Sequence, residues 1–175
     1  MNTCRIFLVA AVALLLAAPA AAATRPTRST VRATSAELGV VAAINQVRVA
    51  HGLVPVRLSA PLSAAAAAHN REMLAGGYFA HESAGGGAFW KRVARFYGNS
   101  LYAYWSTGEN LVWSSGDLDA GRALQLWMAS PQHRENILTP RWREIGISLA
   151  HVDVAPGVYA GSDVTLITTD FGVRR

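Results

Sequence analysis

The spacing of apolar residues changes along this chain, and the change limits the folds that it can form. Ser35 can cap a helix in which apolar residues recur at three- and four-residue steps, namely Leu38, Val41, Ala42, Ile44 and Val49. This spacing predicts an amphipathic helix that ends at His51 and Gly52. After Pro140 the step becomes two, since Ile145, Ile147 and Leu149 alternate with smaller residues. That alternation is typical of a strand.

Further helices are predicted between these two regions. One begins near Pro61, runs through an alanine block and ends at Gly76 and Gly77. A second covers residues 89–96, where Phe89, Val93 and Phe96 share one helical face. A third covers residues 118–128 and carries Leu124, Leu126 and Trp127 inward.

The strands are predicted to cluster late in the chain. The alternation at residues 145–150 gives one strand, residues 164–171 are rich in β-branched residues and give a second, and residues 157–159 are predicted to add a short third strand. Helices therefore precede strands. This order favours the α+β class, with an antiparallel sheet covered by helices, over a repeated βαβ sheet.

The N-terminal segment has the three parts of a cleavable export signal. Arg5 is followed by an apolar run over residues 6–16 and by small residues at the expected cleavage region, Ala20, Ala21, Ala22 and Ala23. The run is shorter than the roughly 20 residues that span a bilayer. We therefore expect a signal peptide at 1–23, a flexible lead-in at 24–36 and one domain at 37–175, secreted without a transmembrane anchor. Removal of Cys4 with the signal leaves no disulfide.

Charge excludes some partners. The chain has 16 Lys and Arg against 11 Asp and Glu, and no long basic run. We therefore expect no nucleic-acid partner. The domain is expected to be a monomer. Arginines near the chain ends, at 25, 28, 32 and 175, are either simply solvated or a contact for an anionic wall or membrane surface.

Common enzyme signatures are missing from the sequence. It has no G-x-S-x-G turn, no cysteine after the signal, and no second histidine four residues after His81. Asp163 and Asp170 are isolated in the sequence and are expected at strand edges or turns. His51, His69 and His151 are expected to have structural roles.

Three short segments instead place a titratable side chain beside apolar residues. They contain His81, Glu109 and His133. His81 and Glu109 follow small residues at expected element boundaries, and His133 lies at a helix start after Ser130 and Pro131. Two imidazoles and a carboxylate could hold a divalent ion, or could form a hydrogen-bonded chain that joins three loops.

The order of these segments resembles the CAP superfamily of cysteine-rich secretory proteins, antigen 5 and pathogenesis-related proteins, also called SCP-like domains, in its bacterial branch. The resemblance extends from about Leu38 to Phe171. It is carried by segments in family order: 44–48 (INQVR) with 52–53, 68–73, 78–81 (YFAH), 108–111 (GENL), 127–138 (WMASPQHRENIL) and 144–147 (EIGI). It implies an α-β-α sandwich with a central antiparallel sheet between helix layers and a cleft on one side.

The resemblance also implies a set of cleft residues. His81 corresponds to the first family histidine, Glu109 to the first glutamate and His133 to the second histidine. Ser130 stands where the second glutamate is expected, so zinc or another divalent metal is expected to bind weakly or not at all. Ser130, Asn110 and Trp105 are expected to line the cleft.

Besides an envelope interaction protein that makes contact through an arginine-containing tail, two functions remain open at this stage. The first is a secreted, non-enzymatic binding module for a small hydrophobic or envelope-derived ligand, with aromatic residues near Glu109 as a stacking surface. The second is a metal-dependent extracellular hydrolase acting on peptides or wall polymers. The missing glutamate and nucleophile favour the first.

Overall fold

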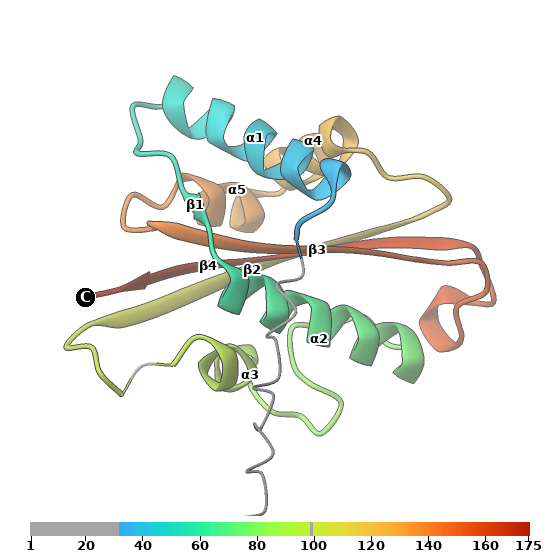
Figure 1. The fold of residues 1–175 in the computed structure, drawn as a ribbon. Helices are drawn as coiled ribbons and strands as arrows, with labels where there is room; N and C mark the ends of the chain where they lie inside the picture. The colour runs from blue at the N-terminus through green and yellow to red at the C-terminus, as the bar shows by residue number, and fades with distance from the viewer. Residues whose placement is uncertain (1–31, 99) are drawn as a thin grey trace, which may run out of the picture.

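The computed structural model describes residues 32–98 and 100–175. The predicted signal peptide and most of the lead-in lie outside these residues. The described chain forms three layers, with one sheet between two layers of helices (Figure 1). Helices α1, α4 and α5 cover one face of the sheet, and α2 and α3 cover the other. The predicted α-β-α sandwich is confirmed.

The sheet has the strand order β1-β3-β4-β2. Its long strands are β2 (Trp105–Ser115), β3 (Glu144–Val152) and β4 (Val164–Arg174), and both β2 and β3 pair antiparallel with β4. The short β1 (Arg57–Leu58) runs parallel to β3, which was not predicted. Helices cover both faces of β4, which is buried as far as Val173.

Strand β2 corrects the sequence analysis, which placed Glu109 at a loop boundary. Gly108, Glu109 and Asn110 resemble a turn because glycine and polar residues are rare in strands. The structure places them inside a strand that is paired with β4 along its whole length. Gly108 is required there, since an added Cβ would collide with the side chains of Asn136 and Trp142.

Helix α1 (Ser35–Ala50) begins one residue earlier than its predicted cap implies. Thr34, not Ser35, is the N-cap, because Glu37 stands three residues after it and completes a capping box. Ser35 and Ala36 are therefore helical, although the lead-in was expected to reach residue 36. The end at His51 is confirmed.

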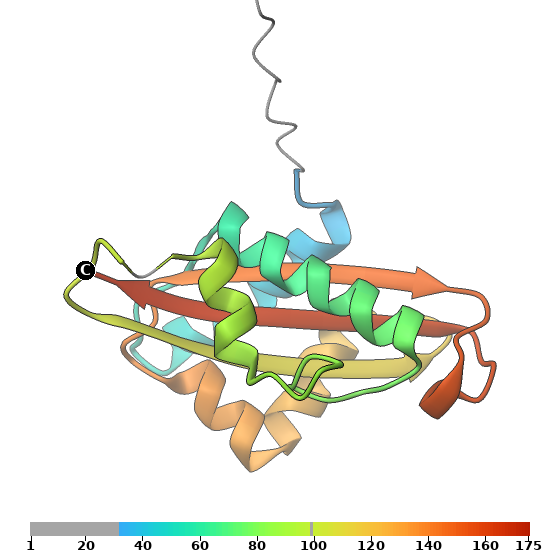
Figure 2. The same cartoon turned by 90° about the horizontal axis from the view of Figure 1, so that it is seen from below.

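Helices α2 (Ala60–Gly76) and α3 (Phe89–Phe96) cross the second face of the sheet, as Figure 2 shows. Alanines let α2 lie close to β3, and Gly146 faces its backbone at Leu62 and Ser63. In α3 the expected apolar face is only partly buried. Val93 is buried, whereas Phe96 is 41% exposed and Arg92 occupies the inner side.

Helices α4 (Ala120–Ala129) and α5 (Pro131–Leu138) cover the first face. Asp119 caps α4, so the helix begins two residues after the predicted start, and Trp127 points into the core. The predicted strand at 157–159 is wrong. Gly157–Tyr159 is a 3-10 helix (η1), because Gly157 and Ala160 adopt positive φ angles that reverse the chain. Within residues 32–98 and 100–175, no helix combines the length and apolar character needed to cross a membrane.

Candidate functional site

Glu109 is the centre of the candidate site. Its side chain points from β2 toward the α2–α3 layer and is fully buried. Oε1 accepts a hydrogen bond of 2.8 Å from His81 Nδ1, and Oε2 accepts one from Arg92 Nη2. Both carboxylate oxygens are therefore engaged by protein groups, and a charged guanidinium balances the buried charge.

The bond to Glu109 fixes the orientation of His81. The imidazole must carry its proton on Nδ1 to donate to the carboxylate, which leaves Nε2 as the free ring atom when the ring is neutral. The His81 side chain is 46% exposed. The structure therefore presents one imidazole nitrogen of His81 at the surface.

Arg92 was not predicted as a site residue. It is 2% exposed, and its Nη1 donates to the backbone oxygen of His81 and to Ser83 Oγ, both at 3.2 Å. One guanidinium thus holds the Glu109 carboxylate and the His81 loop together. The sequence carries a signal for it: Arg92 stands three residues after Phe89, on the face of a short helix that should be apolar.

His133 approaches from the other helix layer. It lies in the first turn of α5, and its Nδ1 is 2.8 Å from the hydroxyl of Ser130. Burial, followed by the charge of His81, lowers the pKa of His133. Ser130 therefore has a defined contact: it supports the ring nitrogen at the position where the family glutamate is expected.

Asn110 and Trp105 differ in their relation to this site. Asn110 is buried and donates to the backbone oxygen of His133 at 3.1 Å, so it ties β2 to α5. Trp105 lies four residues before Glu109, about 13 Å along a strand. Its Nε1 donates to Tyr97 O at 2.9 Å, and the ring packs on the Leu62–Val93–Tyr97 cluster. The structure does not bring Trp105 to the histidines.

Asp170 also corrects the sequence analysis, which treated it as an isolated carboxylate at an edge or turn. It pairs directly with Glu109 across β4 and β2 and is completely buried. Its two oxygens find no hydrogen-bond partner in the described part of the chain. Burial and the neighbouring Glu109 charge raise the pKa of Asp170 well above its ordinary value. The strand at residues 164–171 was predicted from its β-branched residues, but its place between β3 and β2, which buries Asp170, was not.

The other histidines have structural surroundings. His69 is buried in α2, and its Nε2 donates to Ala80 O at 2.8 Å. His51 Nδ1 lies 2.8 Å from Val47 O at the end of α1. His151 lies near Thr165, Asp153 and Asp163 at the exposed end of β3.

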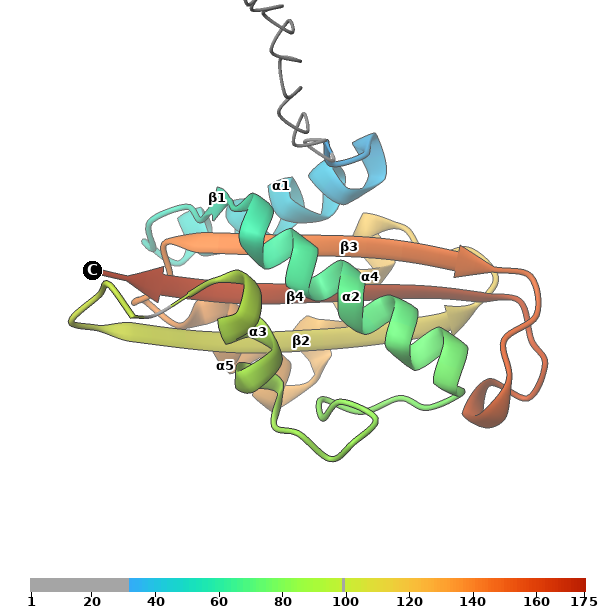
Figure 3. The ribbon, with the colours of Figure 1, turned by 60° about the horizontal axis from the view of Figure 1, so that its bottom comes forward.

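The donor set limits what metal this site could hold. Among the described residues, no three His, Cys, Asp or Glu side chains form a group that could hold a metal ion. Both carboxylate oxygens of Glu109 accept hydrogen bonds from His81 and Arg92. What remains is two supported imidazoles, one on each side of the β2 edge. Figure 3 shows the α2–α3 loop and α5 flanking this edge.

Two surface hollows lie next to these residues rather than between them. One, of about 340 Å³, lies where α4 meets α5 and is lined by Met128, Ala129, Pro131, Leu138, Arg134 and Glu135. The other, of about 440 Å³, lies between the α2–α3 loop and the outer side of α3. The first adjoins the helix that carries His133, and the second adjoins Arg92.

Comparison with known proteins identifies the class. A model of the cysteine-rich secretory protein family (CAP) matches residues 41–159. The uncharacterized protein YkwD of Bacillus subtilis is 32% identical over 111 residues, which is 63% of this chain and 41% of YkwD. The uncharacterized membrane protein YlbC of the same organism is 26% identical over 66% of this chain and 32% of its own length. The chain thus spans well under half of these curated relatives.

Solved structures agree on the fold. An extracellular SCP-domain protein from Bacillus anthracis has a TM-score of 0.60 at 24% identity, covering 79% of this chain and 40% of that chain. An outer surface protein from Borrelia burgdorferi has a TM-score of 0.57 at 16% identity, covering 78% and 90%. The chain has an SCP-type fold, and it belongs to the cysteine-rich secretory protein (CAP) family.

Proposed function

We propose that this chain is an exported, non-enzymatic binding module whose ligand is a small hydrophobic molecule, such as an acyl chain from the cell envelope. The observation that carries the proposal is the state of Glu109. A general base must reach the proton that it abstracts. Glu109 is fully buried and bonded on both oxygens, so it supports His81 and has no free oxygen for substrate or water.

The lining of the hollow between α4 and α5 favours a hydrophobic ligand. Four of its lining residues are apolar, and the other two are Arg134 and Glu135. We propose that Arg134 holds a carboxylate or phosphate end group at this polar side. Its volume of about 340 Å³ falls within the roughly 300–1,000 Å³ of small-molecule sites. A chain with an apolar tail and an anionic end matches both features.

The two histidines support at most a weak divalent site. His81 and His133 are the residues that would hold the ion, each through Nε2, because Glu109 and Ser130 occupy the two Nδ1 atoms. A metal-bound imidazole commonly has its other nitrogen supported in this way. A zinc ion there would act as a Lewis acid on a bound oxygen.

The N-terminal segment supports export. We propose a signal peptide at residues 1–23, with cleavage near Ala20 to Ala23, and a monomeric domain that begins with α1. One solved relative is described as an extracellular protein. A mass spectrum of the protein recovered from culture medium tests this, because retention of residues 1–23 would contradict cleavage.

Fluorescence of a dansyl-labelled fatty acid tests the ligand. We expect saturable binding to the wild type and a loss of about tenfold in affinity for Leu138→Gln, which places an amide in the hollow. Leu124→Gln is the matched control, because Leu124 is also a partly buried leucine beside the same core but lies outside the hollow. Equal effects of both changes, or no saturable binding, would contradict the proposal.

The hydrolase remains the second candidate, and a separate assay addresses it. Peptide and wall-polymer libraries are incubated with the wild type and with the double variant His81→Ala, His133→Ala, in the presence of zinc. The binding proposal predicts equal, background cleavage. Cleavage by the wild type that the folded double variant loses would establish the hydrolase instead.

A further inference from the structure

Exposed apolar side chains gather on one part of the described chain. Five of the large ones lie between residues 90 and 104, on α3 and in the loop that follows it. Leu101, in this loop, is 91% exposed, the highest fraction for a large apolar residue in the described part of the chain. The other four are 39–45% exposed: Trp90, Phe96, Tyr102 and Tyr104. Single exposed apolar residues are common, whereas a group of them is typical of an interaction site.

The end of β4 brings arginines to this loop. Tyr104 N donates to Arg175 O at 2.8 Å, and Arg175 N donates to Tyr104 O at 3.0 Å. Figures 2 and 3 show the loop and the C-terminus side by side at one end of the sheet. The Arg174 guanidinium lies 4.0 Å from the centre of the Tyr97 ring and 5.0 Å from that of Tyr102, and the Arg175 guanidinium lies 5.1 Å from that of Tyr104. The aromatic rings of the loop therefore have cations beside them.

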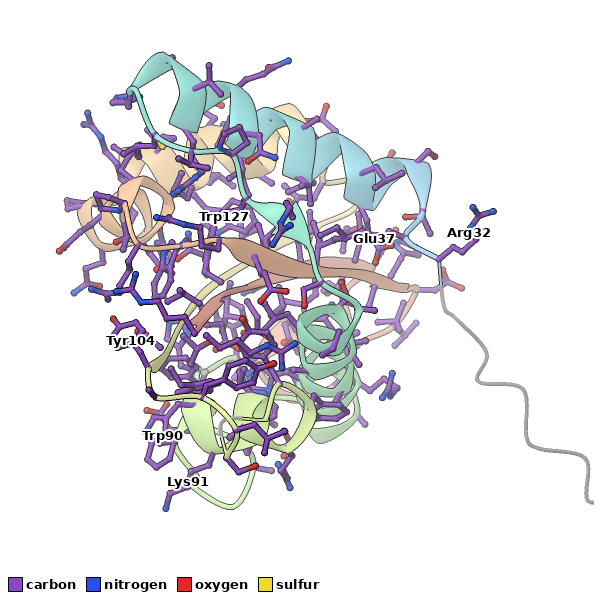
Figure 4. The ribbon with its side chains drawn as sticks, turned by 60° about the vertical axis from the view of Figure 1, so that its left-hand side comes forward. Arg32, Glu37, Trp90, Lys91, Tyr104 and Trp127 are labelled. Carbon is purple, nitrogen blue, oxygen red and sulfur yellow. The ribbon has the colours of Figure 1, made fainter. Side chains whose placement is uncertain are left out.

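Trp90 and Lys91 extend this surface. The Lys91 ammonium lies 5.6 Å from the centre of the Trp90 ring. Figure 4 shows both side chains on the same side of the molecule as Tyr104. We call this surface the loop patch, and its residues are Trp90, Lys91, Leu101, Tyr102, Tyr104 and Arg175.

The charge of the loop patch is positive. Neither residues 90–104 nor residues 171–175 contain Asp or Glu. The neighbouring Glu144 is engaged by protein groups, since its Oε2 accepts a hydrogen bond from Tyr97 Oη and lies 3.8 Å from Arg174 Nε. The patch is therefore complementary in charge to an anionic partner.

The shape of the loop patch favours a deformable partner. Neither of the two surface hollows is lined by Leu101, Tyr102 or Tyr104, so these side chains project from the surface instead of enclosing a small molecule. A sugar polymer would stack on the rings and leave the leucine in water. A bilayer accepts all three kinds of side chain, because leucine enters the acyl region, tyrosine and tryptophan lie at the level of the headgroups, and lysine and arginine meet the phosphates.

We infer that the loop patch docks the domain on the surface of an anionic phospholipid bilayer. Leu101 inserts at the tip, the aromatic rings lie in the interface, and Lys91 and Arg175 contact the headgroups. The contact is peripheral and reversible, since one leucine and a few rings bury far less apolar surface than a membrane anchor does. The acyl hollow between α4 and α5 contains none of the patch residues, so the two proposals are independent.

Sedimentation with vesicles tests the inference. The mature protein is mixed with vesicles of equal parts phosphatidylglycerol and phosphatidylcholine, and with vesicles of phosphatidylcholine alone. We expect a partition coefficient at least about tenfold higher for the anionic vesicles, because they attract lysine and arginine. Equal sedimentation with both kinds of vesicle, or none with the anionic kind, overturns the inference.

A pair of double variants tests the apolar contact. Leu101→Ser with Tyr102→Ser should lower the partition coefficient for anionic vesicles by at least about fivefold, because less apolar surface leaves water. Val154→Ser with Val158→Ser is the matched control. These valines are 73% and 58% exposed and lie beside η1, at the opposite end of the sheet (Figure 1). Equal losses in the two double variants, or no loss in the first, contradict docking through the loop patch.

A second pair of variants tests the charge. Arg175→Gln should weaken binding to the anionic vesicles by about threefold, whereas Arg122→Gln, at an exposed position of α4, should leave it unchanged. Equal binding by these two variants counts against the inference. So does binding of soluble polyphosphate that matches vesicle binding and is unchanged in Leu101→Ser, because the partner would then be a polyanion. Either failure leaves the acyl-ligand proposal untouched, since the patch variants do not alter the α4–α5 hollow.

Discussion

Glu109 and Asp170 lie directly opposite each other on β2 and β4, both buried, beneath the His81–Arg92 contact. Only Glu109 has partners for its oxygens, because Asp170 finds none in the described part of the chain. Burial and the Glu109 charge raise the pKa of Asp170. The buried pair therefore combines one carboxyl group that His81 and Arg92 hold and one whose charged form is disfavoured by its surroundings.

Asp170→Asn should stabilise the protein at neutral pH. Because the pKa of Asp170 is raised in the folded state, the unfolded state releases this proton at a lower pH than the folded state does. The free energy of unfolding therefore falls as pH rises above the ordinary pKa of aspartate. Asparagine removes that cost. We measure the change that Asp170→Asn makes in the free energy of unfolding, by urea denaturation at pH 7 and at pH 3. The substitution should be more stabilising at pH 7 than at pH 3 by at least about 1.4 kcal/mol, the free energy of one pKa unit. An identical effect at both pH values would show that Asp170 is ionised in the fold.

Glu109→Gln should destabilise the fold. The change keeps the shape of the side chain but leaves the guanidinium of Arg92 buried without a counter-charge. Removing one partner of a buried ion pair costs about 3–5 kcal/mol. Urea denaturation at pH 7 measures this, with Glu135→Gln on the exposed side of α5 as the control. A loss below about 1 kcal/mol for Glu109→Gln would contradict the ion-pair role.

Acid should weaken the fold through its buried histidines. Burial is the largest cause that lowers the pKa of His69, and it also lowers that of His133. The folded state therefore resists protonation, and stability is lost as pH falls below the ordinary value of about 6.5. We expect His69→Gln to lose less stability than the wild type between pH 7 and pH 5. Parallel curves for the two proteins would rule out His69 as a source of acid sensitivity.

Ser130→Glu should strengthen zinc binding. Ser130 Oγ is 2.8 Å from His133 Nδ1, so a carboxylate introduced there stands beside the imidazole. Partners of this kind change metal affinity by about 10–100-fold. Calorimetry with zinc at neutral pH should show a gain of at least about tenfold over the wild type and over Ser114→Glu. The gain should vanish when His133→Ala is added, and a gain that survives this change would place the metal elsewhere.

Gly146→Ala should show how closely α2 packs on the sheet. A Cβ at this position collides with the backbone of Leu62 and Ser63, which cannot move without shifting α2. We expect a loss of about 3 kcal/mol in the free energy of unfolding, at the upper end for overpacking. Gly85→Ala is the control, because open space surrounds that position and its φ is not positive. Equal stability of the two variants would contradict the packing.

The sequence predicts the helices well because their signals are local. The apolar spacing in α1 and the glycine end of α2 depend on neighbours a few residues away. Strand β2 was missed because Glu109 and Asn110 are polar, and only pairing with β4 and coverage by both helix layers make them strand residues. The residues 157–159 were mistaken for a strand because their turn depends on positive φ angles.

The candidate site was predicted in part. The segments that carry His81, Glu109 and His133 were found, and the structure joins His81 to Glu109 and His133 to Ser130. Arg92 was missed because its partner, Glu109, lies 17 residues further along the chain. Asp170 was missed because it meets Glu109 only through the pairing of β4 with β2. Spacing along the chain does not encode such contacts.

The central claim is that the hollow between α4 and α5 binds an acyl chain and leaves it chemically unchanged. The most direct test locates the bound chain and asks whether it stays intact. ¹⁵N–¹H NMR spectra of the mature protein are recorded while a fatty acid ester is added, and the ester is analysed afterwards by mass spectrometry. The binding proposal predicts saturable amide shifts centred on residues 128–138 and recovery of the intact ester. Shifts centred elsewhere, no saturation, or conversion of the ester to acid and alcohol would contradict it.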